Sequence, residues 1–558
     1  MFTLSAKWQQ NGKSYESDRF DNDGFTLELQ ESDEQIFATL TAKADLDFQA
    51  LTITSPHAFA EDDLFYANGY QAWTTSREYG KTDCAHGITS LAHISRFTTE
   101  LAATSGDYFF ADYGKAGVFH GYTYCYLRKK GSRQITLYGS KSERQGFTVF
   151  VADMPNGQFS IKKDIEGLHL QKGQVYEVFH IFKITEEFNK AFDRYFFDFV
   201  GVKKPDIGRL TGYTSWYNYF QNINEEIILR DLNGLDCAKD EVNIFQVDDG
   251  FEPAVGDWFT PDKKKFPNGM GYIADKIHEK GYKAGLWLAP FNAQRSSKIL
   301  KEHPEWVIRN NRNGKPLLGC LGWGGAYTFD IYNAEFRAHL KKVFDTVLLD
   351  WGFDLVKLDF LYSQCMQPRA GKTRGEIMCD AVDLLRECCG DKRILGCGVP
   401  LGACMGIFDA CRIGCDANKV FPPQIINKLG INREIPSSQN AINNAIFRNH
   451  LDGRAFSCDP DVFFLRDNNI KYNLQQKLLL GKVNAVCGNV LFVSDNAGDY
   501  DAKTVSYLKD FFADKNYKVL SAEYEDGERI RLRFLENGAE KELYFNINTG
   551  DGNIMECI

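Results

Sequence analysis

Hydrophobic and polar residues alternate in short runs along the first 200 residues of the chain. Such runs lie at residues 25–29, 36–40 and 175–179, and turn-forming segments such as residues 21–24 and 154–157 separate them. Alternation with a period of two places one set of side chains on each face of a β-strand, so one face can be buried. Many short strands joined by turns are typical of a β-sandwich. The pattern therefore predicts an N-terminal β-sandwich domain over residues 1–200.

The pattern changes at residues 201–205, Gly-Val-Lys-Lys-Pro, which indicate a domain boundary. Beyond it, apolar segments of strand length alternate with amphipathic segments such as residues 270–280, 335–349 and 375–389. Eight strands that alternate with helices over about 290 residues are the arrangement of a (β/α)8 barrel. The candidate strands are residues 212–216, 242–247, 284–288, 355–359, 393–397, 410–414, 454–458 and 489–493.

The predicted fold class is therefore α/β, with a central TIM barrel over residues 201–501. Residues 527–534 and 541–546 return to strand-like alternation, which predicts a small C-terminal antiparallel β domain over residues 502–558. A doubly wound sheet is the structural alternative, but no GxGxxG motif follows the first candidate strand.

Composition and charge argue against some classes of binding partner. The chain has 558 residues, of which 44% are apolar and 25% charged, as in ordinary globular proteins. A net charge of −10 with dispersed lysines and arginines argues against nucleic acid or an anionic membrane as partner. Neither a signal-peptide core nor an apolar run of membrane-spanning length is found, so we expect no membrane span.

The cysteines and histidines indicate neither a disulfide framework nor a metal site. The fifteen cysteines are irregularly spaced and several lie inside apolar runs. We interpret most of them as buried thiols in a reducing compartment, which favours a cytoplasmic location. No pair of CxxC motifs and no HxH or HExxH motif accompanies the ten histidines, so we expect no metal ion and no cofactor.

Candidate chemistry lies where the predicted barrel strands end. In barrel enzymes the reacting groups lie at the C-terminal ends of the strands. Acids, one lysine, one arginine and tryptophans occupy these positions, and none is a histidine. Two carboxylates with an aromatic platform for a polar ring suit glycoside hydrolysis. The residues are Trp216, Tyr217, Asp248, Asp249, Trp287, Lys357, Asp359, Cys397, Arg412, Asp416, Asp459 and Asp461.

Asp359 is the candidate nucleophile. It ends the apolar run at residues 355–358, and Lys357 lies two positions before it, on the same face of an extended strand. A neighbouring cation keeps a carboxylate ionised, and an ionised carboxylate at a strand end is a plausible nucleophile. The alternative is a buried structural ion pair.

Asp416 is the candidate general acid, because fewer cations adjoin it in the sequence and an apolar site favours the protonated form. Its alternative role is to cap a helix. Asp248 and Asp249 could accept hydrogen bonds from sugar hydroxyls, although Asp-Gly is also a common turn dipeptide.

Residues 65–74 break the alternation of the first domain and combine aromatic residues, which include Trp73, with Asn and Gln. This segment is either a hydrophobic contact between domains or a loop that reaches over a neighbouring site. Trp216 and Trp287 either stack on a sugar ring or close the top of the barrel.

The order of the motifs makes the sequence resemble the α-galactosidases (melibiases) of glycoside hydrolase family 36, in particular the shorter bacterial members. The resemblance covers most of the chain, from residue 68 to about residue 495. The motifs are SWYNYF (215–220), FQVDD (245–249), GLWLAPF (285–291), HPEWV (303–307), KLDFL (357–361), LGCGVP (395–400), RIGCD (412–416) and DPD (459–461).

This resemblance implies an N-terminal β-supersandwich, a catalytic barrel and a C-terminal antiparallel sheet. It also implies retaining hydrolysis of terminal α-galactosides without a metal, with Asp359 as nucleophile and Asp416 as acid/base. The positions that match sugar-binding residues and aromatic walls are Trp73, Trp216, Tyr217, Asp248, Asp249, Trp287, Lys357, Cys397 and Arg412.

The sequence departs from the family pattern at Ala72, at Cys415, at residues 456–458 and at residues 319–325. These departures leave the leaving group and the substituent at the sugar C2 open. The remaining alternatives are an α-N-acetylgalactosaminidase, a galactosyl transferase of the raffinose-synthase kind, a non-catalytic sugar-binding relative and a metal-dependent barrel hydrolase. We expect a small carbohydrate substrate and a monomer, the latter by analogy alone.

Overall fold

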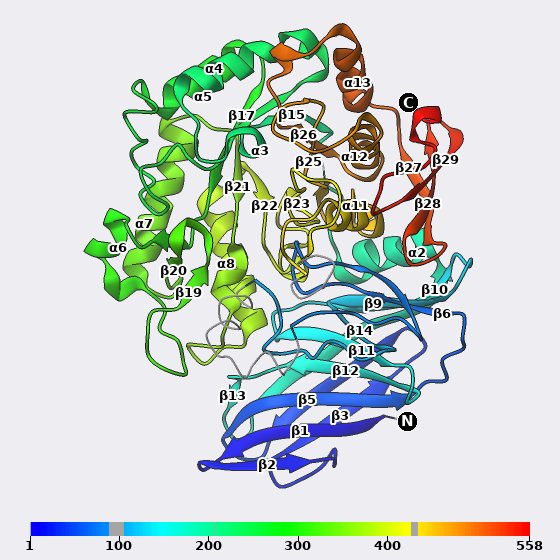
Figure 1. The fold of residues 1–558 in the computed structure, drawn as a ribbon. Helices are drawn as coiled ribbons and strands as arrows, with labels where there is room; N and C mark the ends of the chain where they lie inside the picture. The colour runs from blue at the N-terminus through cyan, green and yellow to red at the C-terminus, as the bar shows by residue number, and fades with distance from the viewer. Residues whose placement is uncertain (1, 89–104, 206, 426–432) are drawn as a thin grey trace.

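Antiparallel sheets form the N-terminal part of the molecule, and a large parallel sheet surrounded by helices forms most of the remainder (Figure 1). The structure is a computed structural model that describes residues 2–88, 105–205, 207–425 and 433–558. In the described part of the chain, no helix is both long and apolar enough to cross a membrane.

Two antiparallel sheets share one core in the N-terminal region, as the alternation predicts. Buried side chains alternate with exposed ones along the first strand, where Leu4, Ala6 and Trp8 face the core. The first sheet has the order β2 (Lys13–Ser17), β1 (Thr3–Gln10), β5 (Leu46–Pro56), β12 (Gln158–Asp164), β11 (Phe147–Asp153), β8 (Val118–Tyr122), with β13 (His169–Leu170) paired to β5. The second has the order β3 (Phe25–Glu31), β4 (Gln35–Ala42), β14 (Val175–Glu187), β10 (Gln134–Ser140), β9 (Tyr124–Lys129), β6 (Asp63–Ala67), β7 (Arg77–Gly80).

The central sheet is curled, and all its strand pairs are parallel. Each of the eight candidate strands contains or overlaps one of its strands, and nearly every residue in these strands is buried because both faces are covered. The order is β24 (Ser457–Asp459), β23 (Ala410–Arg412), β22 (Arg393–Gly396), β21 (Leu355–Leu358), β17 (Lys283–Leu288), β16 (Ile244–Val247), β15 (Leu210–Thr214), β26 (Val490–Val493), β25 (Val462–Phe463).

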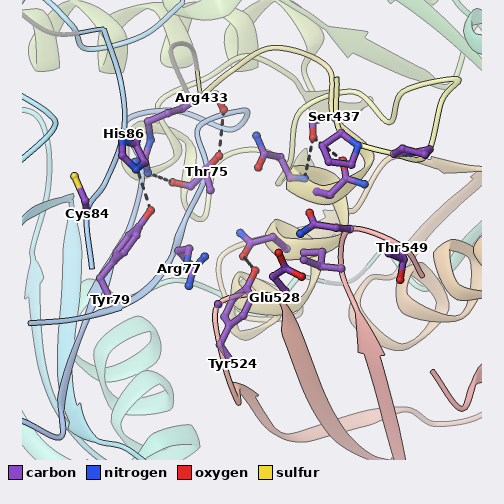
Figure 2. Close-up of a pocket in the computed structure, with 18 of the residues that line it drawn as sticks. Thr75, Arg77, Tyr79, Cys84, His86, Arg433, Ser437, Tyr524, Glu528 and Thr549 are labelled. Atoms are coloured by element: carbon purple, nitrogen blue, oxygen red, sulfur yellow. Dashed lines mark hydrogen bonds between the residues drawn. The ribbon is translucent and has the colours of Figure 1, made fainter. Parts of the chain in front are cut away.

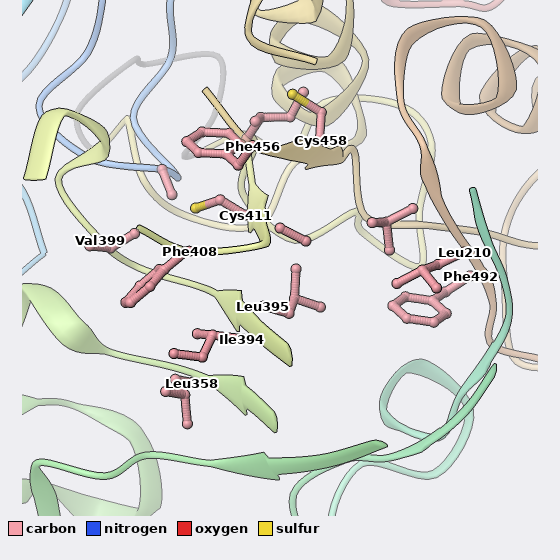
Figure 3. Packing of buried hydrophobic residues seen from close by; sticks show 14 of the residues in the cluster. Leu210, Leu358, Ile394, Leu395, Val399, Phe408, Cys411, Phe456, Cys458 and Phe492 are labelled. Carbon is pink, nitrogen blue, oxygen red and sulfur yellow. The ribbon is translucent and has the colours of Figure 1, made fainter. Parts of the chain in front are cut away.

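Side chains from adjacent strands interlock inside this region (Figure 3). Leu358, Ile394 and Leu395 come from β21 and β22 and are fully buried, near Phe408 and Cys411. The two strands at the ends of the sheet, β24 and β25, are separated by only Pro460 and Asp461 in the chain.

Helices follow most of the parallel strands. The predicted helices over residues 270–280, 335–349 and 375–389 correspond to α5, α7 and α8, and α8 begins with a capping box between Thr373 and Glu376. The α-helices within the described residues are α2 (Phe188–Asp193), α3 (Trp216–Tyr219), α4 (Glu225–Gly234), α5 (Gly269–Glu279), α6 (Lys298–Glu302), α7 (Ala334–Asp345), α8 (Arg374–Cys389), α9 (Leu401–Cys404), α11 (Ser438–Phe447), α12 (Leu474–Cys487) and α13 (Ala502–Phe512).

Two small antiparallel sheets complete the described structure. One consists of β18 (Asn292–Gln294), β20 (Ala326–Thr328) and β19 (Leu318–Cys320), beside the ends of the parallel strands. The other consists of β27 (Lys518–Tyr524), β28 (Arg529–Glu536) and β29 (Ala539–Asn546) near the C-terminus. Tyr524 of β27 stacks on Phe447 of α11 with ring centroids 5.3 Å apart, so the last sheet packs on the helical layer. All fifteen cysteines are unpaired, and thirteen of them are buried.

Candidate active site

A cavity of about 350 Å³ opens where the parallel strands end. Eight of the eleven site residues predicted from the sequence line it: Trp73, Trp216, Asp248, Asp249, Trp287, Lys357, Asp359 and Asp416. The other three, Tyr217, Cys397 and Arg412, lie buried beside the lining residues without forming part of the wall. Strand ends in different parts of the chain therefore supply one shared site.

Asp359 follows directly after the fully buried strand β21, which fixes its position. Its backbone N–H donates to the Leu288 carbonyl at 2.9 Å, and its carboxylate accepts hydrogen bonds from Trp287 Nε1 (3.0 Å) and from the Phe360 N–H (2.8 Å). Burial raises the pKa of this carboxyl above its usual value, whereas the Lys357 ammonium and the Trp287 hydrogen bond oppose the rise. Phe360 has a φ of 57°, a left-handed conformation that costs energy for a bulky residue and is common at functional sites.

Lys357 forms its ion pair with Asp248 rather than with Asp359, which corrects the expectation from the sequence. Its Nζ lies 2.8 Å from Asp248 Oδ2, and both side chains are buried. Burial lowers the pKa of Lys357, but the carboxylates of Asp248 and Asp359 outweigh this effect and raise it overall. Gln246 Nε2 donates to the same Asp248 oxygen at 2.8 Å. Asp248 is therefore held rigidly at the end of β16.

Asp249 is held from two loops that the sequence analysis did not assign to the site. Gln221 Nε2 lies 3.0 and 3.2 Å from the two carboxylate oxygens, and Trp323 Nε1 donates to Oδ2 at 2.7 Å. Trp323 has a φ of 57°, and its ring lies 5.8 Å from that of Trp287 and 5.0 Å from that of Phe360. The unusual Gly-Trp-Gly-Gly run at residues 322–325 was the one signal in the sequence that could have indicated this fourth tryptophan of the cavity wall.

Asp416 faces the cavity with a side chain that is 34% exposed. Arg412 Nη2 donates to Asp416 Oδ1 at 3.1 Å, so the sequence argument that few cations adjoin this carboxyl does not hold in space. The Ser437 N–H donates to the Asp416 carbonyl at 2.8 Å, which brings the segment 433–437 beside the candidate acid/base.

Asp461 anchors the residues behind Asp416. Its Oδ1 accepts from the Tyr217 hydroxyl (2.7 Å) and lies 3.0 Å from Arg412 Nη1, while its Oδ2 accepts from the Ala417 N–H (2.7 Å). Burial raises the pKa of Asp461 to about 7, although Arg412 opposes the rise. Tyr217 and Arg412 thus contact Asp461 or Asp416, and their direct contact with sugar stays a prediction.

Trp73 reaches the cavity from the N-terminal region. Its Nε1 donates to Cys397 Sγ at 3.3 Å, and its ring packs edge-to-face on Phe360 with centroids 5.3 Å apart. The next residue, Thr74, donates from Oγ1 to Glu434 Oε1 at 2.8 Å. The sequence left two explanations for residues 65–74, a hydrophobic contact between domains or a loop that reaches over a site. The structure agrees with the second, because this loop lies against the cavity.

Glu434 and Pro436 also line the cavity, although neither belongs to a motif that the sequence predicted for the site. Glu434 Oε2 accepts from the Tyr108 hydroxyl at 2.6 Å, and burial raises the pKa of Glu434 to about 7. Arg433 and Ser437 of the same segment line a second, larger cavity of about 940 Å³ (Figure 2). Residues 433–437 therefore contribute to the walls of both cavities.

Of the residues that the structure describes, one group has the spacing to hold a metal ion: His303, Glu305 and Glu335. None of the three lines the 350 Å³ or the 940 Å³ cavity.

Parts of the sequence are similar to known α-galactosidases and to a related enzyme. The melibiase family model matches residues 214–376. The α-galactosidase Mel36A of Lactobacillus acidophilus is 40% identical over 74 residues, which are 12% of this chain and 10% of that protein. A blood-group A α-D-galactosamine galactosaminidase of Flavonifractor plautii is 30% identical over 175 residues, or 29% of this chain and 16% of that protein. These alignments span less than a fifth of either curated relative.

The fold is similar to that of a solved α-galactosidase, TtGalA of Thermus thermophilus. The two superpose with a TM-score of 0.70 over 96% of this chain and 98% of that chain, at 22% sequence identity. The similarity predicted from the motifs is therefore confirmed: residues 214–376 match the melibiase family model, and the chain is similar to α-galactosidases in parts of its sequence and to α-galactosidases of glycoside hydrolase family 36 in its fold.

Proposed function

We propose that this chain is a retaining exo-α-galactosidase that releases terminal, non-reducing α-D-galactosyl residues from galactosides and galacto-oligosaccharides. The observation that carries the proposal is that Asp359 and Asp416, which come from two different strands, line the same small cavity. A volume of about 350 Å³ lies near the lower end of ligand pockets and suits a single sugar ring. Tryptophans on several sides supply flat apolar surfaces for that ring.

Two carboxyl groups of this kind support double displacement. An Asp359 carboxylate oxygen attacks the anomeric carbon while Asp416 gives its proton to the glycosidic oxygen, and the leaving alcohol departs. The Asp359 ester then holds the galactosyl group. Asp416 next removes a proton from water, the water oxygen attacks the anomeric carbon, and the Asp359 carboxylate is released. Two inversions give an α-galactose product.

Asp248, Asp249 and Lys357 are proposed to bind the sugar hydroxyls. The two aspartates are anchored acceptors. Asp248 accepts hydrogen bonds from Gln246 and Lys357. Asp249 accepts hydrogen bonds from Trp323 and Gln221. Anchored groups recognise a ring without reorganising on binding, which favours turnover.

The pH dependence of activity provides one test of the role of Asp359. Attack requires the ionised carboxylate, and burial raises its pKa above the ordinary 3.8. We expect kcat/KM to fall on acidification with an apparent pKa above 3.8. Trp287→Phe removes a hydrogen bond that lowers this pKa, so its acid limb should move to higher pH than in the wild type. An acid limb at or below 3.8, or one that Trp287→Phe moves downward, would contradict the assignment.

We also propose that the curled sheet is a closed (β/α)8 barrel. β24 and β25 pair with opposite ends of the sheet yet are separated by only two residues, which supports their being two halves of one interrupted strand. The domain limits 1–200, 201–501 and 502–558, a monomeric state and a cytoplasmic location remain predictions.

An α-N-acetylgalactosaminidase is the second candidate, because one relative is a galactosaminidase. This activity requires space beside the sugar C2. Initial rates on p-nitrophenyl α-galactoside and on its N-acetylgalactosaminide decide between the two, and we expect the galactoside to be preferred. NMR of the first-formed sugar should show the α-anomer. A β-anomer would exclude the retaining mechanism, and no turnover of either glycoside would exclude both candidates.

A further inference from the structure

Arg448 is a completely buried arginine that lies directly after helix α11. Its three nitrogens donate to five oxygens, none of which belongs to a carboxylate: Asn68 Oδ1 (3.2 Å), Gly69 O (3.3 Å), Gln71 O (3.2 Å), Ala72 O (2.6 Å) and Ile413 O (2.9 Å).

Burying an arginine without a carboxylate partner costs free energy, which suggests that the side chain has a structural role. A buried cation without an opposite charge carries a large desolvation cost, and burial lowers the pKa of Arg448. The guanidinium remains charged, and its five N–H groups in one rigid plane match the five acceptors. An ammonium has only three donors, so lysine is unable to reproduce this set of contacts.

The five acceptors belong to two segments that are far apart in the sequence and meet at the cavity. Residues 68–72 lead directly into Trp73, which forms one wall. Ile413 follows Arg412, the residue that contacts Asp416. The side chain of Arg448 therefore joins the loop that carries Trp73 to the strand end that carries the acid/base.

We propose that Arg448 is a positioning residue that fixes Trp73 relative to Arg412 and Asp416 and so sets the shape of the sugar cavity. This inference rests on the proposed function, because it assigns the cavity to a galactosyl ring.

The rest of the loop is held independently of Arg448. Asn444 of α11 accepts from the Ser76 N–H (2.9 Å) and donates to the Thr74 carbonyl (3.0 Å), and Asn443 donates to the Ser76 carbonyl (2.8 Å). The Ala72 N–H donates to the Val399 carbonyl at 2.9 Å. Loss of Arg448 should therefore loosen the loop near Trp73 without releasing it from the molecule.

Arg454 offers a matched control. It also links the helical layer to the N-terminal region, since its Nε lies 2.6 Å from Asp193 Oδ1 and its Nη2 3.2 Å from Asn189 Oδ1 of α2. Among the described residues, its side-chain hydrogen bonds go to Asp193, Asn189 and the His450 carbonyl, and none goes to residues 68–72 or to β23. A variant at this position also loses an arginine that joins the helical layer to the N-terminal region, but it should leave Trp73 in place.

The experiment compares Arg448→Lys, Arg448→Met and Arg454→Met with the wild type on p-nitrophenyl α-galactoside. We expect Arg448→Lys to raise KM about tenfold with a smaller change in kcat, and Arg448→Met to raise KM further, because small displacements in a binding site have large effects. Arg454→Met should stay within about twofold of the wild type in both constants. Asn68→Ala removes one of the five acceptors of Arg448, together with the hydrogen bond from Asn68 Nδ2 to the Tyr122 carbonyl, and should raise KM in the same direction even if the Arg448 variants fold poorly.

A double-mutant cycle with Trp73→Ala separates positioning from general stability. If Arg448 acts through Trp73, Arg448→Lys should raise KM by much less in the Trp73→Ala background than in the wild type. Three outcomes would overturn the inference but not the proposed function. They are additive effects in the cycle, equal KM values for Arg448→Lys and an active wild type, and equal losses in the Arg448 and Arg454 variants. A wild-type protein with no activity on α-galactosides would instead overturn the proposed function and the inference with it.

Discussion

Replacement of Asp359 by alanine is expected to lower kcat on p-nitrophenyl α-galactoside by about 10⁴-fold or more, because the variant has no atom to form the galactosyl ester. The cavity around it should survive. The backbone N–H of residue 359 donates to the Leu288 carbonyl whatever the side chain is, and β21 is fixed by its neighbours on both sides. The measurement is steady-state hydrolysis, with thermal unfolding as the control for folding.

Azide provides the sharper readout for this variant. Alanine leaves space on the face of the sugar that the carboxylate would attack, so azide can react there directly with an activated galactoside. One inversion then gives β-galactosyl azide, and activity is partly restored. Wild-type turnover in Asp359→Ala, or restored activity that gives the α-azide, would remove Asp359 from the role of nucleophile.

Periodicity in the sequence predicted the strands well because burial in this protein follows simple geometry. In β1, exposed and buried residues alternate, as in a strand with one face on a core. In β16, β21 and β26 every residue is buried, as in a parallel sheet covered on both faces. The pattern did not indicate that β24 ends at Asp459 and that β25 begins only at Val462, because the break at Pro460 and the left-handed Asp461 depends on local backbone geometry.

The strand-end rule also located most of the site, since it requires only knowledge of where apolar runs stop. It could not assign partners across strands. Lys357 adjoins Asp359 in the sequence, yet its ammonium pairs with Asp248, which is 109 positions earlier and belongs to a strand two places away in the sheet. The register of β16, β17 and β21 determines that Lys357 pairs with Asp248 rather than with Asp359.

Residues from irregular loops were the ones that the sequence missed. Trp323, Gln221 and Glu434 follow no period, and their side chains reach the cavity only because of tertiary contacts with Asp249 and Thr74. The same holds for the contacts of Arg448, which are mostly with backbone carbonyls. Backbone acceptors are present at every residue, so no pattern of residue types identifies such a partner.

Replacement of Asp416 by alanine should have an effect that depends on the leaving group. An alkoxide such as the glucose oxygen of melibiose leaves only with a proton, so kcat/KM for melibiose should fall by about 10³-fold or more. p-Nitrophenolate leaves without protonation, so kcat/KM for the aryl galactoside should fall far less. Its kcat should still drop, because water now attacks the galactosyl ester without a general base, and a burst of nitrophenolate should precede slow turnover.

Azide distinguishes the two carboxyl groups once more. In Asp416→Ala the ester on Asp359 still forms, and azide needs no general base to attack it. This second inversion gives α-galactosyl azide, the opposite anomer to that expected from Asp359→Ala. Equal losses on melibiose and on the aryl galactoside, or the same azide anomer from both variants, would contradict the separate roles of the two residues. The pair of anomers thus tests whether Asp359 and Asp416, which line one cavity, act on opposite faces of one sugar ring.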